Sequence, residues 1–311
     1  MAWWRRGVVL ALGGGGARGF AHVGVLEVLE QAGIRVRAIV GVSAGSVAGA
    51  GYALGRTPAQ MAERILAFAK SRLATDGRVR SLVEQAGEHQ ECSWGDRLER
   101  LFCRGRVMKS LVLGESVLGP DYFRAVVHFF LPEAEIESLP LPFAAVASDI
   151  LSGQPVVLRE GSLRKAVLAS CSVPGAAPVV EHQGRKLVDG GVVCLVPVRL
   201  ARDLFGAPVV AVNVEQDIGV KEPPELALET YFRASEIQAA MLNRLQLEAA
   251  DFIIRPQVGD IHWADFMQAE RILEEGRQAA RQALPQLRRL LRPRLWPWND
   301  KAICHSMMEH G

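Results

Sequence analysis

The chain has 311 residues, of which 49% are hydrophobic and 23% charged, and its formal net charge is +2. These proportions are typical of a folded globular protein and exclude an intrinsically disordered chain. The balance of charge gives no indication of a nucleic-acid partner. The five cysteines are scattered and form no CxxC pair, so we expect reduced thiols in a cytoplasmic protein and neither a disulfide framework nor a bound metal.

The first 130 residues predict strands that alternate with helices. The expected elements, in chain order, are a strand at 7–12, a helix at 20–31, a strand at 36–42, a helix at 44–54, a helix from Thr57-Pro58 and a helix at 121–130. Residues 38–55 carry no charge, but their five glycines indicate a strand, a turn and a buried helix rather than a membrane span. Residues 73–120 mix charge, glycine and short apolar pieces and predict no clear element.

The second half of the chain continues the alternation. Its expected elements are strands at 142–150, 154–159, 186–188, 208–214 and 252–255, and helices at 162–169, 225–249 and 265–291. Alternating strands and helices predict an α/β fold with an open, mostly parallel central sheet and helices on both faces. Nothing divides the chain, so we expect one domain over residues 1–291 and a C-terminal tail over 292–311.

A glycine-rich segment, Gly13–Gly19, lies between the first predicted strand and helix. It matches G-x-G-x-x-G, the dinucleotide-binding pattern, but the acidic residue that should hold the ribose is missing from the second strand. Arg35 or Arg37 leaves an NADP site open, whereas a phosphate-binding P-loop is excluded because no Gly-Lys-Ser/Thr follows. An ordinary tight turn is the other interpretation.

The segment Gly41-Val-Ser43-Ala-Gly45 matches G-x-S-x-G at a predicted strand-to-helix junction. A sharp turn at this place would expose the Ser43 side chain and point the N-terminus of the next helix at a developing negative charge. A nucleophilic serine also needs an oxyanion hole, which the N–H groups of the glycine-rich segment would supply. The two motifs together indicate acyl-transfer chemistry.

The general base has two candidates. Asp189 ends a predicted strand and is followed by Gly190-Gly191, which permits a close approach to the serine. His262 is the only histidine placed for the order serine, acid, histidine. Each also has a structural explanation, Asp189 as part of an ordinary turn and His262 as a surface residue.

These motifs, in this order and spacing, resemble the patatin-like phospholipases, and among them the bacterial members akin to neuropathy target esterase. Supporting stretches are 169–175 and 259–266, and the resemblance covers about residues 7–290. It implies a patatin-like three-layer sandwich and a Ser43–Asp189 dyad without a catalytic histidine. It further implies an oxyanion hole formed by the backbone N–H groups of Gly14, Gly15 and Gly16. Arg18 would hold that loop in place.

The resemblance implies hydrolysis of acyl esters of phospholipids or lysophospholipids through an acyl-enzyme, with no cofactor and no metal. Two departures from the family pattern bear on the site. Cys194-Leu195 stand where relatives often have Asn-Pro, and Ala176-Ala177 stand where they often have a Phe. Acyl transfer or thioester cleavage by the same dyad, and a non-catalytic binding protein on the same fold, are the alternatives.

A membrane-contact hypothesis comes from both ends of the chain. Residues 281–294 hold five arginines and no acid, two tryptophans follow, and Trp3-Trp4-Arg5-Arg6 opens the chain. Arginine with tryptophan suits the surface of an anionic bilayer, here the inner face of the cytoplasmic membrane. The other interpretation is an amphipathic helix that packs on the core. The sequence carries no signal for an oligomeric state.

Overall fold

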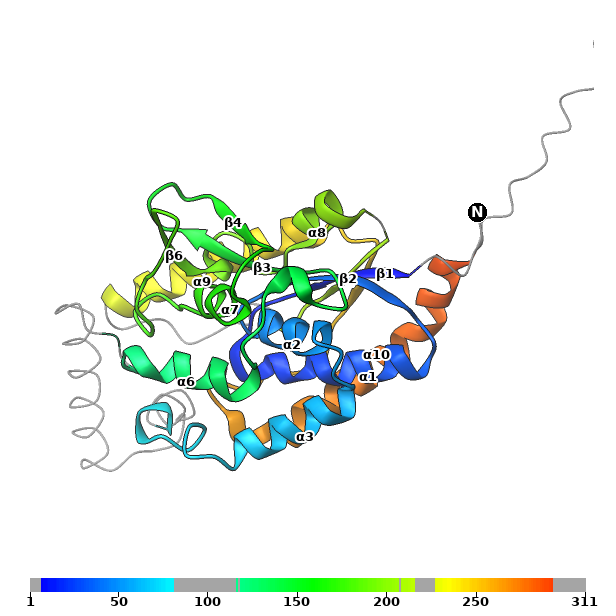
Figure 1. Ribbon diagram of the computed structural model, residues 1–311, viewed down its shortest axis with the longest axis horizontal. Coiled ribbons are helices and arrows are strands. Elements are labelled where there is room, and N and C mark those ends of the chain that lie inside the picture. The colour runs from blue at the N-terminus through cyan, green and yellow to red at the C-terminus, as the bar shows by residue number, and fades with distance from the viewer. Residues whose placement is uncertain (1–6, 81–115, 117, 207, 216–226, 293–311) are drawn as a thin grey trace, which may run out of the picture.

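The computed structural model describes residues 7–80, 116, 118–206, 208–215 and 227–292 (Figure 1). Its sheet has the strand order β5-β6-β3-β2-β1-β7-β8, and β4 pairs with β3. The strands are Val8–Leu12 (β1), Val36–Val42 (β2), Phe143–Asp149 (β3), Pro155–Leu158 (β4), Val180–His182 (β5), Arg185–Asp189 (β6), Val209–Val212 (β7) and Phe252–Ile254 (β8). Strands β3, β2, β1, β7 and β8 are parallel to their neighbours in this run, whereas β4, β5 and β6 pair antiparallel. The predicted mostly parallel sheet is confirmed.

The helices follow the predicted alternation. They are Ala21–Gln31 (α1), Ala44–Ala53 (α2), Pro58–Ala69 (α3), Pro120–Phe130 (α6), Leu163–Ser170 (α7), Val198–Phe205 (α8), Ala227–Leu247 (α9) and Ala269–Leu291 (α10). Thr57 begins α3 as expected, because its side chain and that of Gln60 form a reciprocal capping box. The sequence analysis missed α8 and β5, since elements this short show no clear periodicity.

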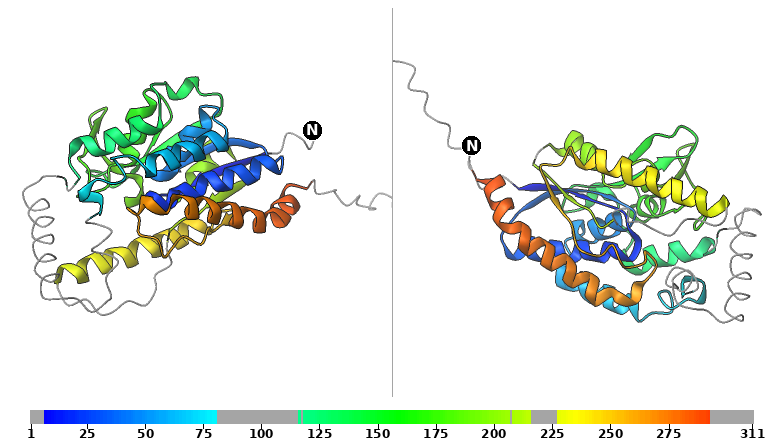
Figure 2. Two further views of the ribbon diagram at one scale, coloured as in Figure 1. Left: turned by 90° about the horizontal axis from the view of Figure 1, so that it is seen from below. Right: turned by 180° about the vertical axis from the view of Figure 1, so that it is seen from behind.

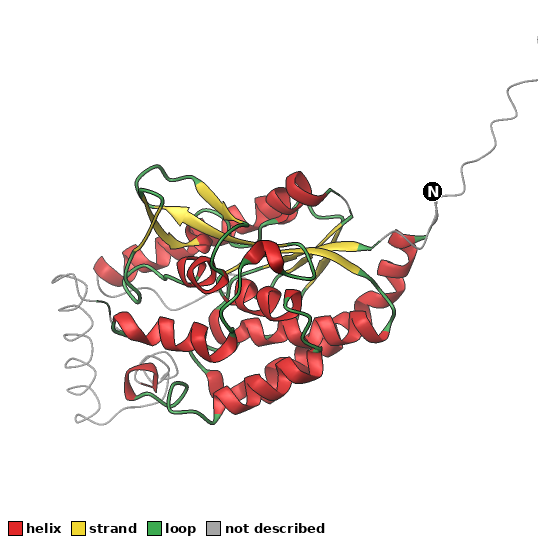
Figure 3. Ribbon diagram, in the orientation of Figure 1, coloured by secondary structure: helices red, strands yellow, loops and turns green. Residues whose placement is uncertain are grey.

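The sheet lies between two helical layers, as the alternation of buried residues along β1 requires. Val8, Leu10 and Leu12 point into a core shared with α1, α3 and α10, whereas Val9 and Ala11 point into a second core that includes residues of α8. Figure 3 shows the strands between helices above and below. From behind (Figure 2, right), α9 lies along the upper side of the sheet and α10 along the lower side.

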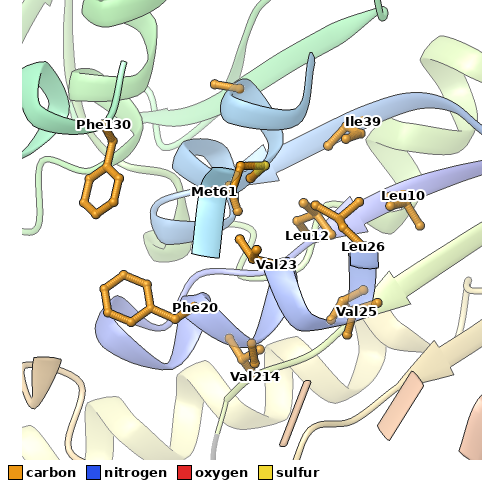
Figure 4. Packing of buried hydrophobic residues seen from close by; sticks show 14 of the residues in the cluster. Leu10, Leu12, Phe20, Val23, Val25, Leu26, Ile39, Met61, Phe130 and Val214 are labelled. Carbon is orange, nitrogen blue, oxygen red and sulfur yellow. The ribbon is translucent and has the colours of Figure 1, made fainter. Parts of the chain in front are cut away.

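The larger core contains long aliphatic side chains and a cluster of aromatic rings. Leu10 and Leu12 of β1 meet Leu26 of α1 at its centre, and Phe20 and Phe130 lie at its edge (Figure 4). This layer of side chains holds α1 and α2 against the sheet. The segments that connect β1 to α1 and β2 to α2 are therefore held in a fixed position.

Several sequence-based predictions fall outside the described residues. They concern the N-terminal Trp-Arg segment, most of residues 73–120 and the tail from 293, including its tryptophans. Residues 281–291, by contrast, belong to α10, which packs on the core through Ala283 and Leu287, as the alternative interpretation expected. Membrane contact by the two chain ends stays a prediction. Among the described helices, none combines the length and apolar character that crossing a bilayer would require.

Candidate active site

Ser43 is the single residue between a buried strand and a helix. β2 ends at Val42 and α2 begins at Ala44, so the chain changes direction within one residue. The Ser43 backbone has φ 50° and ψ −124°, a conformation that residues with a side chain rarely adopt. Strain of this kind concentrates at functional sites. The sharp turn expected from the G-x-S-x-G motif is present, and it places Ser43 at a cavity beside the N-terminus of α2.

Neighbouring groups hold Ser43 in this conformation. Its N–H donates to the Oγ of Ser170 at 2.9 Å, and that hydroxyl donates to the Val146 carbonyl at 2.6 Å. The Ser46 hydroxyl donates to the Ser43 carbonyl at 2.6 Å. Glycine is needed at 45 because a Cβ there would lie 2.3 Å from the carbonyl oxygen of the last residue of β1. The turn is thus fixed by β1, β3 and α7 together.

The register of the sheet brings Asp189 to Ser43. Val42 of β2 pairs with Val146 of β3, and the next residue of β3, Ala147, pairs with Asp189 of β6. The Ser43 hydroxyl lies close enough to the Asp189 carboxylate to lower its pKa, and both side chains line the same cavity. The fold therefore brings together the two residues expected to form the dyad, although 145 positions lie between them in the chain.

Asp189 is buried, with 6% of its surface exposed. Burial raises the pKa of its carboxyl from 3.8 to about 6, although hydrogen bonds from Ser43 and from the Gly191 N–H oppose the rise. The Gly191 N–H lies 2.7 Å from Oδ1 and fixes the orientation of the carboxylate. Asp189 is thus ionised at neutral pH, and its pKa is close to that of a general base suited to neutral conditions.

Cys171 is a second nucleophilic side chain at this cavity. Its sulfur lies 3.9 Å from the Ser46 hydroxyl. Burial, followed by the nearby charge of Asp189, raises the pKa of the Cys171 thiol well above its usual range. Because the thiolate is the reactive form of cysteine, Cys171 is a poor nucleophile at neutral pH.

The glycine-rich loop lies directly against the serine. A Cβ at Gly14 would be 3.3 Å from the Cβ of Ser43. The Gly14 N–H, however, donates to the Leu195 carbonyl at 3.1 Å, so here the structure differs from the expected three-donor oxyanion hole. Within the described ranges, no backbone carbonyl accepts from the N–H groups of Gly15 and Gly16. Because Gly15 and Gly16 also line the cavity, their N–H groups remain candidate donors for an oxyanion.

Arg18 fixes this loop from behind. Its guanidinium donates to the Ile261 carbonyl at 2.7 Å and forms an ion pair with Glu215 at 2.8 Å. The Ala17 N–H donates to the Trp263 carbonyl at 2.7 Å, so the segment around residues 259–266 supports the loop as well. Arg18 is 7% exposed, and a buried guanidinium needs such partners. Arg18 thus lies where the expected loop support requires it.

The cavity at Ser43 has a volume of about 700 Å³ and a mostly apolar lining. Its size is in the range of small-molecule sites in proteins. Ser43, Asp189 and the glycine loop line it, as do aromatic side chains that include Phe20, Phe68 and Phe130. A long apolar group next to an activated hydroxyl therefore fits this cavity.

Comparison with known proteins places the chain in a family. A family model described as patatin-like phospholipase matches residues 10–202, a range that contains Ser43, Asp189 and the glycine loop. The chain belongs to the patatin-like phospholipase family. The predicted resemblance is confirmed.

The relatives of this patatin-like chain include bacterial and mammalian proteins. An uncharacterized NTE family protein of Mycobacterium tuberculosis is 30% identical over 303 residues, which cover 90% of this chain and 46% of that protein. Patatin-like phospholipase domain-containing protein 6 of Mus musculus is 31% identical over 209 residues, which cover 67% of this chain and 13% of that protein. The chain thus spans less than half the length of these two relatives.

Among solved structures, VipD from Legionella pneumophila aligns with this patatin-like chain at a TM-score of 0.49 and 13% identity, covering 90% of this chain and 67% of that one. The type III effector protein ExoU aligns at a TM-score of 0.38 and 16% identity, covering 90% of this chain and 53% of that one.

Two alternatives from the sequence find no support in the geometry. Arg35 and Arg37 lie at the start of β2, whereas the glycine loop follows the end of the parallel strand β1. The two arginines are therefore at the opposite end of these parallel strands, about 20 Å from the loop, and cannot hold a phosphate there. His262 is absent from the described cavity lining, and its Nδ1 instead accepts from the Ala264 N–H at 3.3 Å. The geometry thus supports neither the NADP hypothesis nor the serine–acid–histidine order.

The sequence analysis missed three supporting residues. His22 is fully buried on α1, and its Nε2 lies 2.8 Å from the Gly13 carbonyl oxygen. Burial lowers the pKa of His22 to about 4, so the neutral ring donates this hydrogen bond and holds the glycine loop. The other two are Glu215, which pairs with Arg18, and Ser170, which accepts from the Ser43 N–H. Of the three, only Ser170 lies in a stretch that the sequence analysis had named, residues 169–175. No cluster of potential metal-ligating side chains occurs in the described part of the chain.

Proposed function

We propose that this patatin-like chain is a serine esterase that hydrolyses acyl esters of phospholipids or lysophospholipids. One observation carries the proposal: the Ser43 hydroxyl, on a strained turn, lies beside the buried Asp189 carboxylate in the lining of an apolar cavity. The dyad accounts for the strained turn at Ser43, and membership of the family supports a lipid substrate.

The first half of the reaction forms an acyl-enzyme. The Asp189 carboxylate takes the Ser43 proton as Oγ attacks the ester carbonyl carbon. The negative charge that develops on the carbonyl oxygen is stabilised by the N–H groups of Gly15 and Gly16 and by the N-terminus of α2. Collapse of the tetrahedral intermediate breaks the ester bond, and Asp189 returns its proton to the leaving alcohol.

The second half releases the fatty acid. Asp189, ionised again, takes a proton from a water molecule that attacks the acyl carbonyl, and the same two N–H groups stabilise the second oxyanion. Collapse breaks the bond to Ser43 Oγ, which regains the proton from Asp189. Because one carboxylate serves as base and then as acid in both halves, no histidine is required.

Labelling with a fluorophosphonate probe tests the nucleophile. We expect the wild-type protein to be labelled at Ser43 and to hydrolyse a short chromogenic ester. Ser43→Ala should lose both properties, whereas Ser138→Ala, which changes an exposed serine outside the cavity, should keep both. Retained turnover in Ser43→Ala would refute the assignment.

A panel of phospholipids and lysophospholipids, with products identified by mass spectrometry, tests the substrate class. Release of free fatty acid supports hydrolysis, and transfer of the acyl group to an added alcohol would instead identify an acyltransferase. Sedimentation with anionic vesicles, before and after removal of residues 292–311, tests the proposed peripheral membrane contact. Unchanged binding after truncation would exclude the tail as the anchor.

A further inference from the structure

The catalytic cavity follows one face of helix α2. The lining residues Ala44, Val47, Ala48 and Gly51 are spaced by three or four and so share one face. From Ser43 to Gly51 the helix rises about 12 Å. Small side chains along this face leave room for a linear group that begins at Ser43 Oγ and lies parallel to the helix.

The middle of this path is apolar. Val23, Met61, Phe20 and Phe130 line it, and the last two rings lie 6.3 Å apart between centroids (Figure 4). A polar headgroup would leave its hydrogen-bonding groups unsatisfied here, which costs several kcal/mol per group in an apolar environment. The acyl chain of the substrate is therefore the part that fits the path.

Two arginines lie beyond the far end of the helix. Arg56 follows α2 by three residues, and Arg64 projects from α3. Both line the catalytic cavity, and both also line a second cavity of about 400 Å³, where the exposed Glu63 is the one acidic residue of the described lining and forms no ion pair with them. The two cations are close enough that the charge of Arg64 adds to the effect of burial in lowering the pKa of Arg56. The chain thus places positive charge at the end of an apolar path.

Part of each guanidinium caps helix α6. Nη1 of Arg56 donates to the Phe130 carbonyl at 2.5 Å, and Nε and Nη2 of Arg64 donate to the Phe129 carbonyl. A guanidinium carries five N–H donors, so capping leaves donors on both side chains. Among the described residues, no carboxylate forms an ion pair with Arg56 or Arg64. The pair therefore retains the capacity to bind an anion.

We propose that Arg56 and Arg64 form a subsite for a carboxylate at the far end of the acyl chain, so that the substrate is the ester of a chain with an anionic terminus. This inference rests on the esterase function proposed above. An extended chain advances about 1.2 Å per bond, so about ten bonds span the path of about 12 Å from Ser43 to Gly51. A half-ester of a dicarboxylic acid of ten to twelve carbons has this length.

The headgroup phosphate of the same lipid does not fit the subsite. In a glycerophospholipid, five or six bonds separate the ester carbonyl carbon from phosphorus, a reach of about 7 Å. This is shorter than the path, and the apolar lining lies between. Arg64 is exposed at this end, so a carboxylate bound there keeps part of its hydration while the chain is buried.

A matched pair of esters tests the subsite. The 4-nitrophenyl ester of decanoate and the mono-4-nitrophenyl ester of decanedioate differ only in the terminal carboxylate. We expect wild-type kcat/KM to be at least about tenfold higher for the charged ester, the size of effect expected when a charged hydrogen bond is made. Arg56→Gln/Arg64→Gln should lose this preference, so that the ratio of its kcat/KM values for the two esters falls to about one. Arg56→Lys/Arg64→Lys should keep part of the preference for the charged ester. Arg159→Gln, which changes an exposed ion pair, should keep all of this preference.

Each other outcome overturns the subsite. Equal rates of the wild type on both esters would exclude anion binding, and an equal loss on both esters in the glutamine variant would mean that the arginines only cap α6. A loss confined to phospholipids, relative to monoacylglycerols, would identify headgroup recognition instead.

If the wild type hydrolyses neither ester, the esterase function fails separately. Calorimetric titration with decanedioate and with decanoate then tests the subsite without turnover. Tighter binding of decanedioate that Arg56→Gln/Arg64→Gln abolishes would support it. Equal or absent binding of the two acids would overturn it.

Discussion

The buried carboxylate of Asp189 should destabilise the folded chain while it serves catalysis. Asp189→Asn keeps the shape of the side chain, and its Oδ1 can still accept from the Gly191 N–H, now at 2.7 Å. The variant removes only the ionisable group. We therefore expect a protein that is more stable than the wild type at neutral pH and inactive on esters.

The expected gain follows from the shifted pKa. Burial raises the pKa of Asp189 from 3.8 to about 6. Each pKa unit corresponds to 1.36 kcal/mol, so the ionised carboxylate costs about 3 kcal/mol of folding free energy above pH 6. Because the folded pKa is the higher one, this cost is absent well below pH 3.8 and grows as the pH rises toward 6. Asp189→Asn should therefore gain about 3 kcal/mol at pH 8 and less than about 1 kcal/mol at pH 4.

Urea denaturation of both proteins at pH 4 and pH 8 measures this difference. The control is Asp251→Asn, because the partly exposed Asp251 carboxylate is paired with Arg202 at 2.8 Å, so its loss should bring no gain in stability. An equal gain for Asp189→Asn at both pH values, or a loss at pH 8, would refute the conclusion that burial dominates at this carboxyl.

Three further outcomes are expected. The wild-type kcat/KM should rise about tenfold from pH 5 to a plateau above pH 7, with a midpoint near 6, because only the ionised carboxylate of Asp189 accepts the serine proton. Glu215→Gln should lower kcat about tenfold in steady-state assays with little change in KM, because it frees Arg18 and loosens the oxyanion donors. Gly51→Leu should shift the preferred chromogenic ester from a ten-carbon to a shorter acyl chain, since its side chain would enter the cavity near Met61.

Matched variants separate these effects from general damage. Glu160→Gln breaks an exposed ion pair far from the loop and should leave kcat unchanged, so an equal loss there would contradict the role given to Glu215. Gly77→Leu changes a glycine that has open space around it and lies outside the cavity lining, and it should leave the chain-length preference as it is. A rate that does not fall between pH 7 and pH 5 would contradict Asp189 as the base.

The local motifs were readable from the sequence because each depends on its immediate neighbours. A strand of apolar residues, a glycine that allows close contact and a following helix predict the turn at Ser43 wherever that segment lies in space. The same holds for the capping box at Thr57 and for the order of strands and helices. Hydrophobic periodicity and backbone sterics act over a few residues, so these predictions were confirmed.

The sequence by itself determined the fold class, the serine turn and the set of residues available for chemistry. Only the tertiary structure decided which of them meet, because contact between distant residues depends on strand register. Register in β3 placed Asp189 rather than His262 beside Ser43. Likewise, the Leu195 carbonyl accepts from the Gly14 N–H, and Arg56 and Arg64 line the same cavity as Ser43, through packing that no local pattern encodes.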